Sequence, residues 1–527
     1  MSSDDRTKEG SIRLRRPSSF SVAFAGLCLC VFIATVDTII LASALPAIAA
    51  DLSATTNQAF WYSVVLLFAQ CVAQPVYGTL TEVFGRKRCM IAALLMFGFS
   101  SLFGALAPNI ECLIVARALQ GLGTGGINVC VNVLVVDLVP QRQRAKMSGI
   151  LSLAGALVSS TSTPISACAI IVFCFFLKLP SVGVKTKTQL RTMDWVGILI
   201  FSGSVSGILF ALVTGGNEYS WSSPHILVPL VFGIVFLAVF VGFEETLAGR
   251  HGLGPAFIPL RLFSRRTAAF GFLMTFLHGM ILWAIPYYYL LYLNISASKS
   301  LLRASVLVLP STFIIPVSAA VAGILMSRLG HFKYFNALAF ALMAAGCGAL
   351  SALRADPSDA VIMGMQLLFS LGGGILFPGR LVAVRAAQRG LPEGQGEDRS
   401  DVRMATSLVS FMTSLGQAFG IAMGSTALQN AWGALVRKVA AAGALSDKGR
   451  TFIIPASQAS TTANAIVKLP PSVAAQYRTI AALIMARVWY ICTGLAPLGS
   501  VAAVASRNLK LYEKEAPVEK RVREQRV

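Results

Sequence analysis

The chain has 527 residues, of which 55% are hydrophobic and only 13% are charged. Soluble proteins carry about 25% charged residues, so this composition, with a mean hydropathy of +0.71, excludes an ordinary soluble protein. The net charge of +21 does not indicate nucleic-acid binding, because the cations lie in tails and loops between apolar runs. Such cations are typical of cytoplasmic loops that face anionic lipid. We therefore expect a protein that crosses the lipid bilayer many times.

The predicted elements begin with a polar N-terminal tail, residues 1–19. The apolar run that follows has no small-residue cleavage site, so we interpret it as a retained span and not as a signal peptide. A helix needs about 20 apolar residues to cross a bilayer. Thirteen runs have this character, near residues 21–45, 60–80, 90–107, 112–136, 148–177, 195–214, 226–243, 269–293, 305–327, 334–353, 360–384, 404–429 and 480–505.

The charges of the two tails conflict with an odd number of spans. Both tails are basic and should lie in the cytoplasm, which requires an even number of crossings. The conflict localises to residues 147–178, where one apolar run has basic residues at both ends. Two crossings would need about 40 residues and a turn. Either this gene product is shortened internally, for example by mis-splicing, or the segment re-enters the membrane without crossing it.

A glycine-rich and charged turn joins the second and third runs, with the sequence GTLTEVFGRKR at residues 78–88. It resembles the loop between helices 2 and 3 of the major facilitator superfamily. The residues that match are Gly78, Glu82, Gly85, Arg86 and Lys87, with Glu82 in place of the usual aspartate. Its consecutive cations place this turn on the cytoplasmic side.

Two charged residues within the predicted spans also match this family. Asp37, in ATVDTIILASALP, resembles the helix-1 signature, and Arg117, in RALQGLGTGG, resembles the helix-4 motif with Gln120. The resemblance implies that Asp37 exchanges the coupling proton and that the fixed charge of Arg117 lowers the pKa of nearby carboxylates. The alternative for Asp37 is a hydrogen bond to a neighbouring helix. We interpret the glycines that follow Gln120 as sites of close helix packing.

Asp137 ends the fourth run. In the family, an acid at this place pairs with the arginine of the helix 2–3 loop and holds the bundle closed. The resemblance thus implies a conformational gate, which consists of Gly78, Glu82, Gly85, Arg86, Lys87 and Asp137. The alternative is that Asp137 is an isolated charge at the membrane interface.

The C-terminal half carries aromatic and polar residues within its spans. We expect a substrate cavity for a ring-bearing, amphipathic compound, lined by Gln120, His278, Trp283, Tyr287, Tyr288 and Gln417. Tryptophan and tyrosine also gather at membrane interfaces without any ligand, and His278 alone is better explained as a structural donor. Arg380 lies late in its run and is expected to extend to the cytoplasm. Asn294 begins a weak glycosylation sequon close to the membrane.

The resemblance implies an all-α major facilitator bundle of the fungal fourteen-span drug:proton antiporter group. Two six-helix halves would flank two central extra helices, with the helix 5/6 region shortened. The expected segments are a cytoplasmic N-terminal tail (1–19), an N-terminal half (20–178), a cytoplasmic loop (179–194), the central helices (195–243), a second cytoplasmic loop (244–268), a C-terminal half (269–505) with an external loop (431–479), and a cytoplasmic C-terminal tail (506–527).

The expected function is proton-coupled efflux of a small hydrophobic or amphipathic compound, such as a drug or a secondary-metabolite toxin. The chain has no phosphate-binding loop, catalytic triad spacing or HExxH motif, so we expect neither an enzyme nor a user of ATP. We also expect no cofactor besides the proton gradient, no metal, and a monomer in the plasma membrane, or else in a vacuolar or vesicle membrane. Alternatives are nutrient or siderophore uptake by the same fold and a truncated, non-transporting product.

Overall fold

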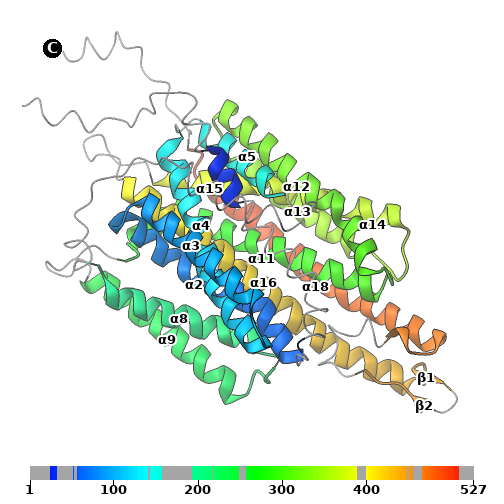
Figure 1. Ribbon diagram of the computed structural model, residues 1–527. Coiled ribbons are helices and arrows are strands. Elements are labelled where there is room, and N and C mark those ends of the chain that lie inside the picture. The colour runs from blue at the N-terminus through cyan, green and yellow to red at the C-terminus, as the bar shows by residue number, and fades with distance from the viewer. Residues whose placement is uncertain are drawn as a thin grey trace, which may run out of the picture.

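The computed structural model describes residues 24–31, 52, 56–139, 143–156, 193–216, 218–247, 257–388, 399–447, 450–454 and 466–509. The described chain is a bundle of long helices with one small hairpin (Figure 1). Asp37 and residues 157–178 of the disputed segment lie outside these residues. Their predicted roles therefore remain predictions.

In the N-terminal half, α4 is the central helix and packs on both α2 and α3. Glycines on α4 allow this close approach: a Cβ atom at Gly121 would collide with the Leu66 carbonyl oxygen of α2, and one at Gly123 with the Phe97 backbone of α3. These contacts support the packing role expected for the helix-4 glycines. The helices of this half are α2 (Thr56–Val83), α3 (Arg86–Ala105), α4 (Ile110–Leu138) and α5 (Arg144–Ala156).

The two central helices, α8 (Trp195–Thr214) and α9 (Pro224–Leu247), pair with each other beside the bundle (Figure 1). Among the described helices, α8 contacts α2 and α16, whereas α9 packs mainly on α8. Much of the apolar surface of α9 is exposed, as expected for a helix that faces lipid.

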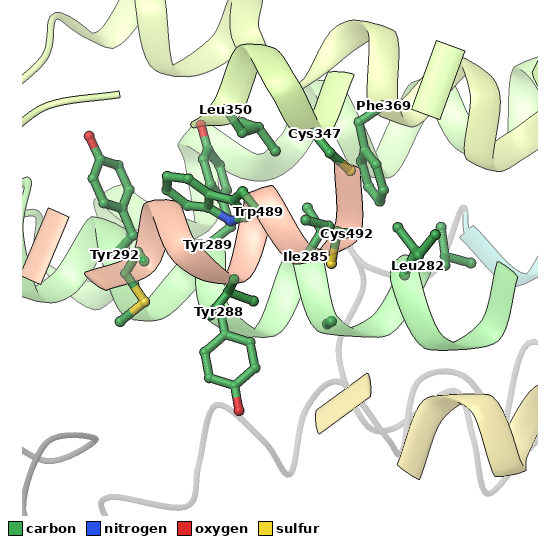
Figure 2. Packing of buried hydrophobic residues seen from close by; sticks show 14 of the residues in the cluster. Leu282, Ile285, Tyr288, Tyr289, Tyr292, Cys347, Leu350, Phe369, Trp489 and Cys492 are labelled. Atoms are coloured by element: carbon green, nitrogen blue, oxygen red, sulfur yellow. The ribbon is translucent and has the colours of Figure 1, made fainter. Parts of the chain in front are cut away.

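The C-terminal half is built around α11, which packs on α15, α16 and α18. Figure 2 shows part of its core, in which Tyr289 and Tyr292 of α11 gather around Trp489 of α18. The elements of this half are α10 (Arg261–Ser264), α11 (Arg266–Ile295), α12 (Leu301–Leu329), α13 (Lys333–Leu350), α14 (Asp359–Met365), α15 (Leu367–Ala387), α16 (Arg399–Ala441), β1 (Ser446–Asp447), β2 (Arg450–Thr451) and α18 (Pro471–Ala505).

Ten helices of the described chain are long and apolar enough to cross a membrane. They coincide with predicted apolar runs. Helix α16 is not among the ten, although its run at residues 404–429 is predicted as a span. It packs against α2, α4, α8, α11 and α18, so its small and polar residues contact protein, and its lower apolar content fits a central position in the bundle.

The segment predicted as the external loop 431–479 contains regular structure at both ends. Helix α16 continues to Ala441 and α18 begins at Pro471, with the β1–β2 hairpin between them. Trp432 explains the extension, because its buried indole donates a hydrogen bond to the Ile454 carbonyl (3.0 Å) and stacks on Tyr477. This segment is polar enough to look like a loop, yet it folds onto the end of the bundle.

The two halves meet most extensively along two helix pairs, α2 with α16 and α5 with α12. In the second pair, a Cβ atom at Gly149 would collide with the Ala319 carbonyl oxygen, and one at Gly323 with the Ala145 carbonyl oxygen. The halves are therefore in direct backbone contact at these points.

Candidate functional site

The predicted gate begins at the turn between α2 and α3. Gly85 adopts φ +81° and ψ 150° there, a backbone conformation that is essentially restricted to glycine. Gly78 lies against the opposite half: a Cβ atom at this position would approach the Cβ and Oγ of Ser407 on α16 to 2.8 Å. Glycine is thus required at one position by the backbone and at the other by a neighbouring helix.

The three predicted gate charges lie together. Arg86 Nε is 3.0 Å from Asp137 Oδ2, and Arg86 Nη2 is 3.8 Å from Glu82 Oε2. These residues come from three helices of the N-terminal half, so the pairs tie α2, α3 and α4 together. Lys87 is half-buried and takes no part in the ion pairs described here.

Sequence reasoning missed a fourth member, Arg403 of α16. It donates hydrogen bonds through Nε and Nη2 to the two carboxylate oxygens of Glu82 (2.5 and 2.9 Å), and Nη1 is 3.5 Å from Asp137 Oδ1. This forked geometry is the strongest arrangement for an arginine and a carboxylate. No local pattern pointed to Arg403, because 321 positions separate it from Glu82 in the chain. We call Glu82, Arg86, Asp137 and Arg403 the gate network.

Further polar contacts join the halves deeper in the bundle. The Asn132 amide donates to Ser410 Oγ (3.3 Å), and Gln70 donates to Ser414 Oγ (3.1 Å). Arg385 is buried and donates to the Asn132 carbonyl (3.0 Å) and to Thr406. Arg385 directly follows the predicted apolar run 360–384, and it bridges α15, α16 and α4. The gate network and these contacts join the two halves between α2, α4 and α16.

Arg117 lies within the N-terminal half and is only 5% exposed. Its Nη1 donates to Gln120 Oε1 (2.9 Å), and Gln120 in turn donates to Ser101 Oγ (2.9 Å). The guanidinium also lies over the Tyr62 ring, 5.2 Å from its centroid. Gln120 was expected to line the cavity, but in this conformation it is buried and orients Arg117.

The predicted cavity residues of the C-terminal half do not form one wall. His278 is fully buried and its Nε2 is 2.9 Å from the Gly373 carbonyl, which fits the structural role suggested for it. Trp283 is half-buried and packs on the core of this half. Gln417 of α16 is buried, and its amide oxygen accepts no hydrogen bond within the described chain.

The two predicted cavity tyrosines have different environments. Tyr288 is buried, points away from Trp489 (Figure 2), and donates a hydrogen bond to the Ile421 carbonyl of α16 (2.7 Å). Tyr287 is 46% exposed, with its ring 5.0 Å from that of Tyr288. Of this pair, only Tyr287 has a surface that a ligand can contact in this conformation.

Arg380 corrects an expectation, because it does not extend to the cytoplasm. It is 6% exposed, donates through Nη1 to Thr413 of α16, and lies over the Phe377 ring at 5.5 Å. Thr413 follows Arg403 on α16 by ten positions, about 15 Å along a helix axis. With the gate network at the predicted cytoplasmic boundary and a hydrocarbon layer about 30 Å thick, we expect Arg380 near the middle of that layer.

The sequon at Asn294 is also poorly placed. Asn294 lies in the last turn of α11, and Ser296 is fully buried and caps that helix. N-glycans occupy exposed surface positions, so the structure does not favour glycosylation here.

Comparison with known proteins identifies the family. The sequence pattern of the Major Facilitator Superfamily matches residues 27–180. The "MFS-type efflux pump MMF1" of Pseudozyma antarctica is 32% identical over 433 residues, which cover 79% of this chain and 78% of that protein. The chain belongs to the major facilitator superfamily.

Other comparisons agree with this facilitator assignment. The "Acurin A biosynthesis cluster MFS-type transporter" of Aspergillus aculeatus is 31% identical over 77% of this facilitator and 74% of its own length. A solved structure of a bacterial homologue of the human lysosomal transporter Spinster has a TM-score of 0.53 at 14% identity, covering 95% of this chain and all of that one. That likeness concerns the fold alone. The facilitator is therefore an all-α, multi-pass membrane protein.

Proposed function

We propose that this facilitator exports small hydrophobic or amphipathic compounds, such as a drug or a secondary-metabolite toxin, in exchange for protons. Two fungal relatives support export, since one is named an efflux pump and the other a transporter of a biosynthesis cluster. The fold supports transport rather than catalysis.

One observation carries the proposal: the gate network joins the two halves, at the end of the bundle that the sequence predicts to be cytoplasmic. A facilitator moves its substrate when two halves rock about a central site and open it to each side in turn. Contacts between halves bias that equilibrium only if they differ between the end states. The pairs of Arg403 with Glu82 and Asp137 meet this condition, because separation of α16 from α2 and α4 would break them.

Proton coupling rests on the sequence together with the buried Arg117. An arginine is not deprotonated in proteins, so its fixed charge favours the ionised form of a carboxylate beside it. We propose that Asp37 takes up and releases the proton, and that Gln120 and Tyr62 hold the Arg117 guanidinium in position. The proton gradient would then be the energy source, with no bound cofactor or metal. We further propose that the protein acts as a monomer in the plasma membrane.

Transport by inside-out vesicles from a pump-deleted yeast tests the proposal. A neutral fluorescent dye should accumulate in vesicles that contain the protein when the lumen is made acidic, and a protonophore should abolish the accumulation. Vesicles without the protein are the control. Two results would contradict proton-coupled efflux: transport of dye into intact cells, or dye accumulation in the vesicles that does not depend on the pH gradient.

A further inference from the structure

The buried guanidinium of Arg380 has no counter-ion in the described chain. Its hydrogen bond through Nη1 is accepted by the neutral hydroxyl of Thr413, and that hydroxyl donates its own proton to the Val409 carbonyl (2.7 Å). The Nε atom of Arg380 is buried without a partner. A buried cation costs several kcal/mol unless it is paired with an anion or hydrated. Within the described residues this buried charge is therefore uncompensated.

One edge of the Arg380 guanidinium is available for a further hydrogen-bonded partner. With Nη1 bound to Thr413, the Nε–Nη2 edge of the guanidinium remains, and no hydrogen bond from this edge is described. Two parallel N–H groups on one edge match the two oxygens of a carboxylate. A lysine would offer only a point charge there. The unoccupied edge therefore suits a compact, planar anion.

Aromatic and polar groups lie near this guanidinium. The Phe377 ring is 5.5 Å from the Arg380 guanidinium, and the His278 ring contacts Phe377 edge to face at 5.2 Å. His278 Nδ1 and Gln417 Oε1 are buried acceptors without partners. Gln417 is one helical turn beyond Thr413, on the same face of α16. Three helices thus bring unsatisfied polar groups and an aromatic ring to one region.

This region adjoins the boundary between the halves. Ser414, the residue after Thr413, accepts a hydrogen bond from Gln70 of α2. Thr413 also lies on the helix that carries Arg403 of the gate network. Substrates of this fold bind near the membrane midplane, between the two halves. Arg380 therefore lies at the depth and on the helices where a substrate would be held.

We propose that Arg380 binds the carboxylate of the exported compound, so that the preferred substrates are apolar, ring-bearing organic acids. This inference rests on the proposed export function and narrows its substrate class. The guanidinium would hold the acid group, and the Phe377 ring would contact the apolar body. Thr413 would keep the guanidinium in place.

Binding of matched probes to the purified full-length protein in lipid nanodiscs tests the proposal. The probes are 2-naphthoate, which is ionised at pH 7, and its neutral methyl ester. Wild-type protein should bind the acid at least tenfold more tightly than the ester. Arg380→Gln should reduce that preference at least tenfold, and Arg380→Lys should reduce it partially. The matched control is Arg303→Gln at an exposed pair with Asp359, which should leave the preference unchanged.

Thermal unfolding separates a binding role from a structural one. Without ligand, Arg380→Gln should unfold at the same or a higher temperature than wild type, because it removes an uncompensated buried charge. If Arg380 serves only to join α15 to α16, the variant should unfold at a lower temperature. 2-Naphthoate should raise the unfolding temperature of the wild type and not that of Arg380→Gln.

Three outcomes would overturn the inference: no acid binding by the wild type, equal binding of acid and ester, or an unchanged preference in Arg380→Gln. Its failure is distinct from failure of the proposed function. If the wild type exports the neutral dye without any preference for acids, only the substrate class is wrong. If it exports neither kind of compound, the export function itself is wrong.

Discussion

Arg403 and Glu82 are joined by two hydrogen bonds although 321 positions separate them in the chain. They belong to opposite halves, and Asp137 and Arg86 complete the network with one further charge of each sign. The network is therefore electrically balanced when closed. Separation of the halves would leave Arg403 on one side and a net negative set on the other, so we expect closure of the cytoplasmic side to depend on this pairing.

A double-mutant cycle tests the coupling between these two residues. We expect Arg403→Gln and Glu82→Gln each to expose the cytoplasmic side, because each leaves its partner half-buried without its main counter-charge. The double variant should resemble either single one, since interaction energies of roughly 0.5–3 kcal/mol are typical of residues in one network. The measurement is labelling of Ser410→Cys by a membrane-impermeant maleimide, in a background without the ten native cysteines.

The matched control for this cycle is Arg261→Gln. Arg261 of α10 pairs with Asp401, which lies on α16 like Arg403, but this pair does not join the two halves. The Arg261→Gln variant should therefore leave the labelling rate unchanged. Strictly additive effects of the Glu82 and Arg403 variants would refute the coupling.

Gly78→Val tests the packing of the closed state. The added side chain would collide with Ser407, so the cytoplasmic side should fail to close and dye export should fall at least tenfold. Gly203→Val on α8 is the control, because no atom lies within 4 Å of a Cβ atom at that glycine. Vesicle transport, corrected for protein amount, is the measurement. Normal export by Gly78→Val would show that α2 and α16 need not approach this closely.

Some of this architecture could be predicted from the sequence and some could not. The helix 2–3 turn and Asp137 were recognisable because local spacing carries the motif. Arg403 was not, because nothing local links it to a residue of the other half. Arg380 was misplaced, since a linear reading gives its distance from the end of the run but not the burial that α16 provides. Trp432 extends α16 through contacts with residues that follow it, which hydropathy alone does not reveal.

Substitutions at the two proposed coupling residues should separate proton movement from substrate movement. Asp37→Asn should abolish dye accumulation driven by a pH gradient and retain exchange of labelled for unlabelled dye without a gradient. Arg117→Lys should lose gradient-driven transport at least tenfold, because lysine cannot reproduce the contacts with Gln120 and Tyr62. Both transport modes can be measured in the same vesicles. If either variant transports dye at the wild-type rate when driven by a gradient, the substituted residue is not part of the coupling mechanism.

Trp432 should stabilise the external end of the bundle. Trp432→Ala removes a fully buried ring and should lower the free energy of unfolding by about 3–5 kcal/mol. Trp432→Phe keeps an aromatic ring next to Tyr477 but loses the hydrogen bond to Ile454, so its effect should be about 1 kcal/mol. Thermal unfolding in detergent measures both. Equal stability of Trp432→Ala and the wild type would mean that this segment does not fold onto the bundle.

The most direct test of the account is the distance between the two halves at the cytoplasmic side. Spin labels at the exposed positions Arg88 of α3 and Tyr334 of α13 would report it by pulsed electron paramagnetic resonance. We predict that Arg403→Gln shifts the distance distribution towards longer values and that Arg261→Gln does not. An identical distribution for Arg403→Gln and the wild type would contradict the claim that the gate network holds the cytoplasmic side closed.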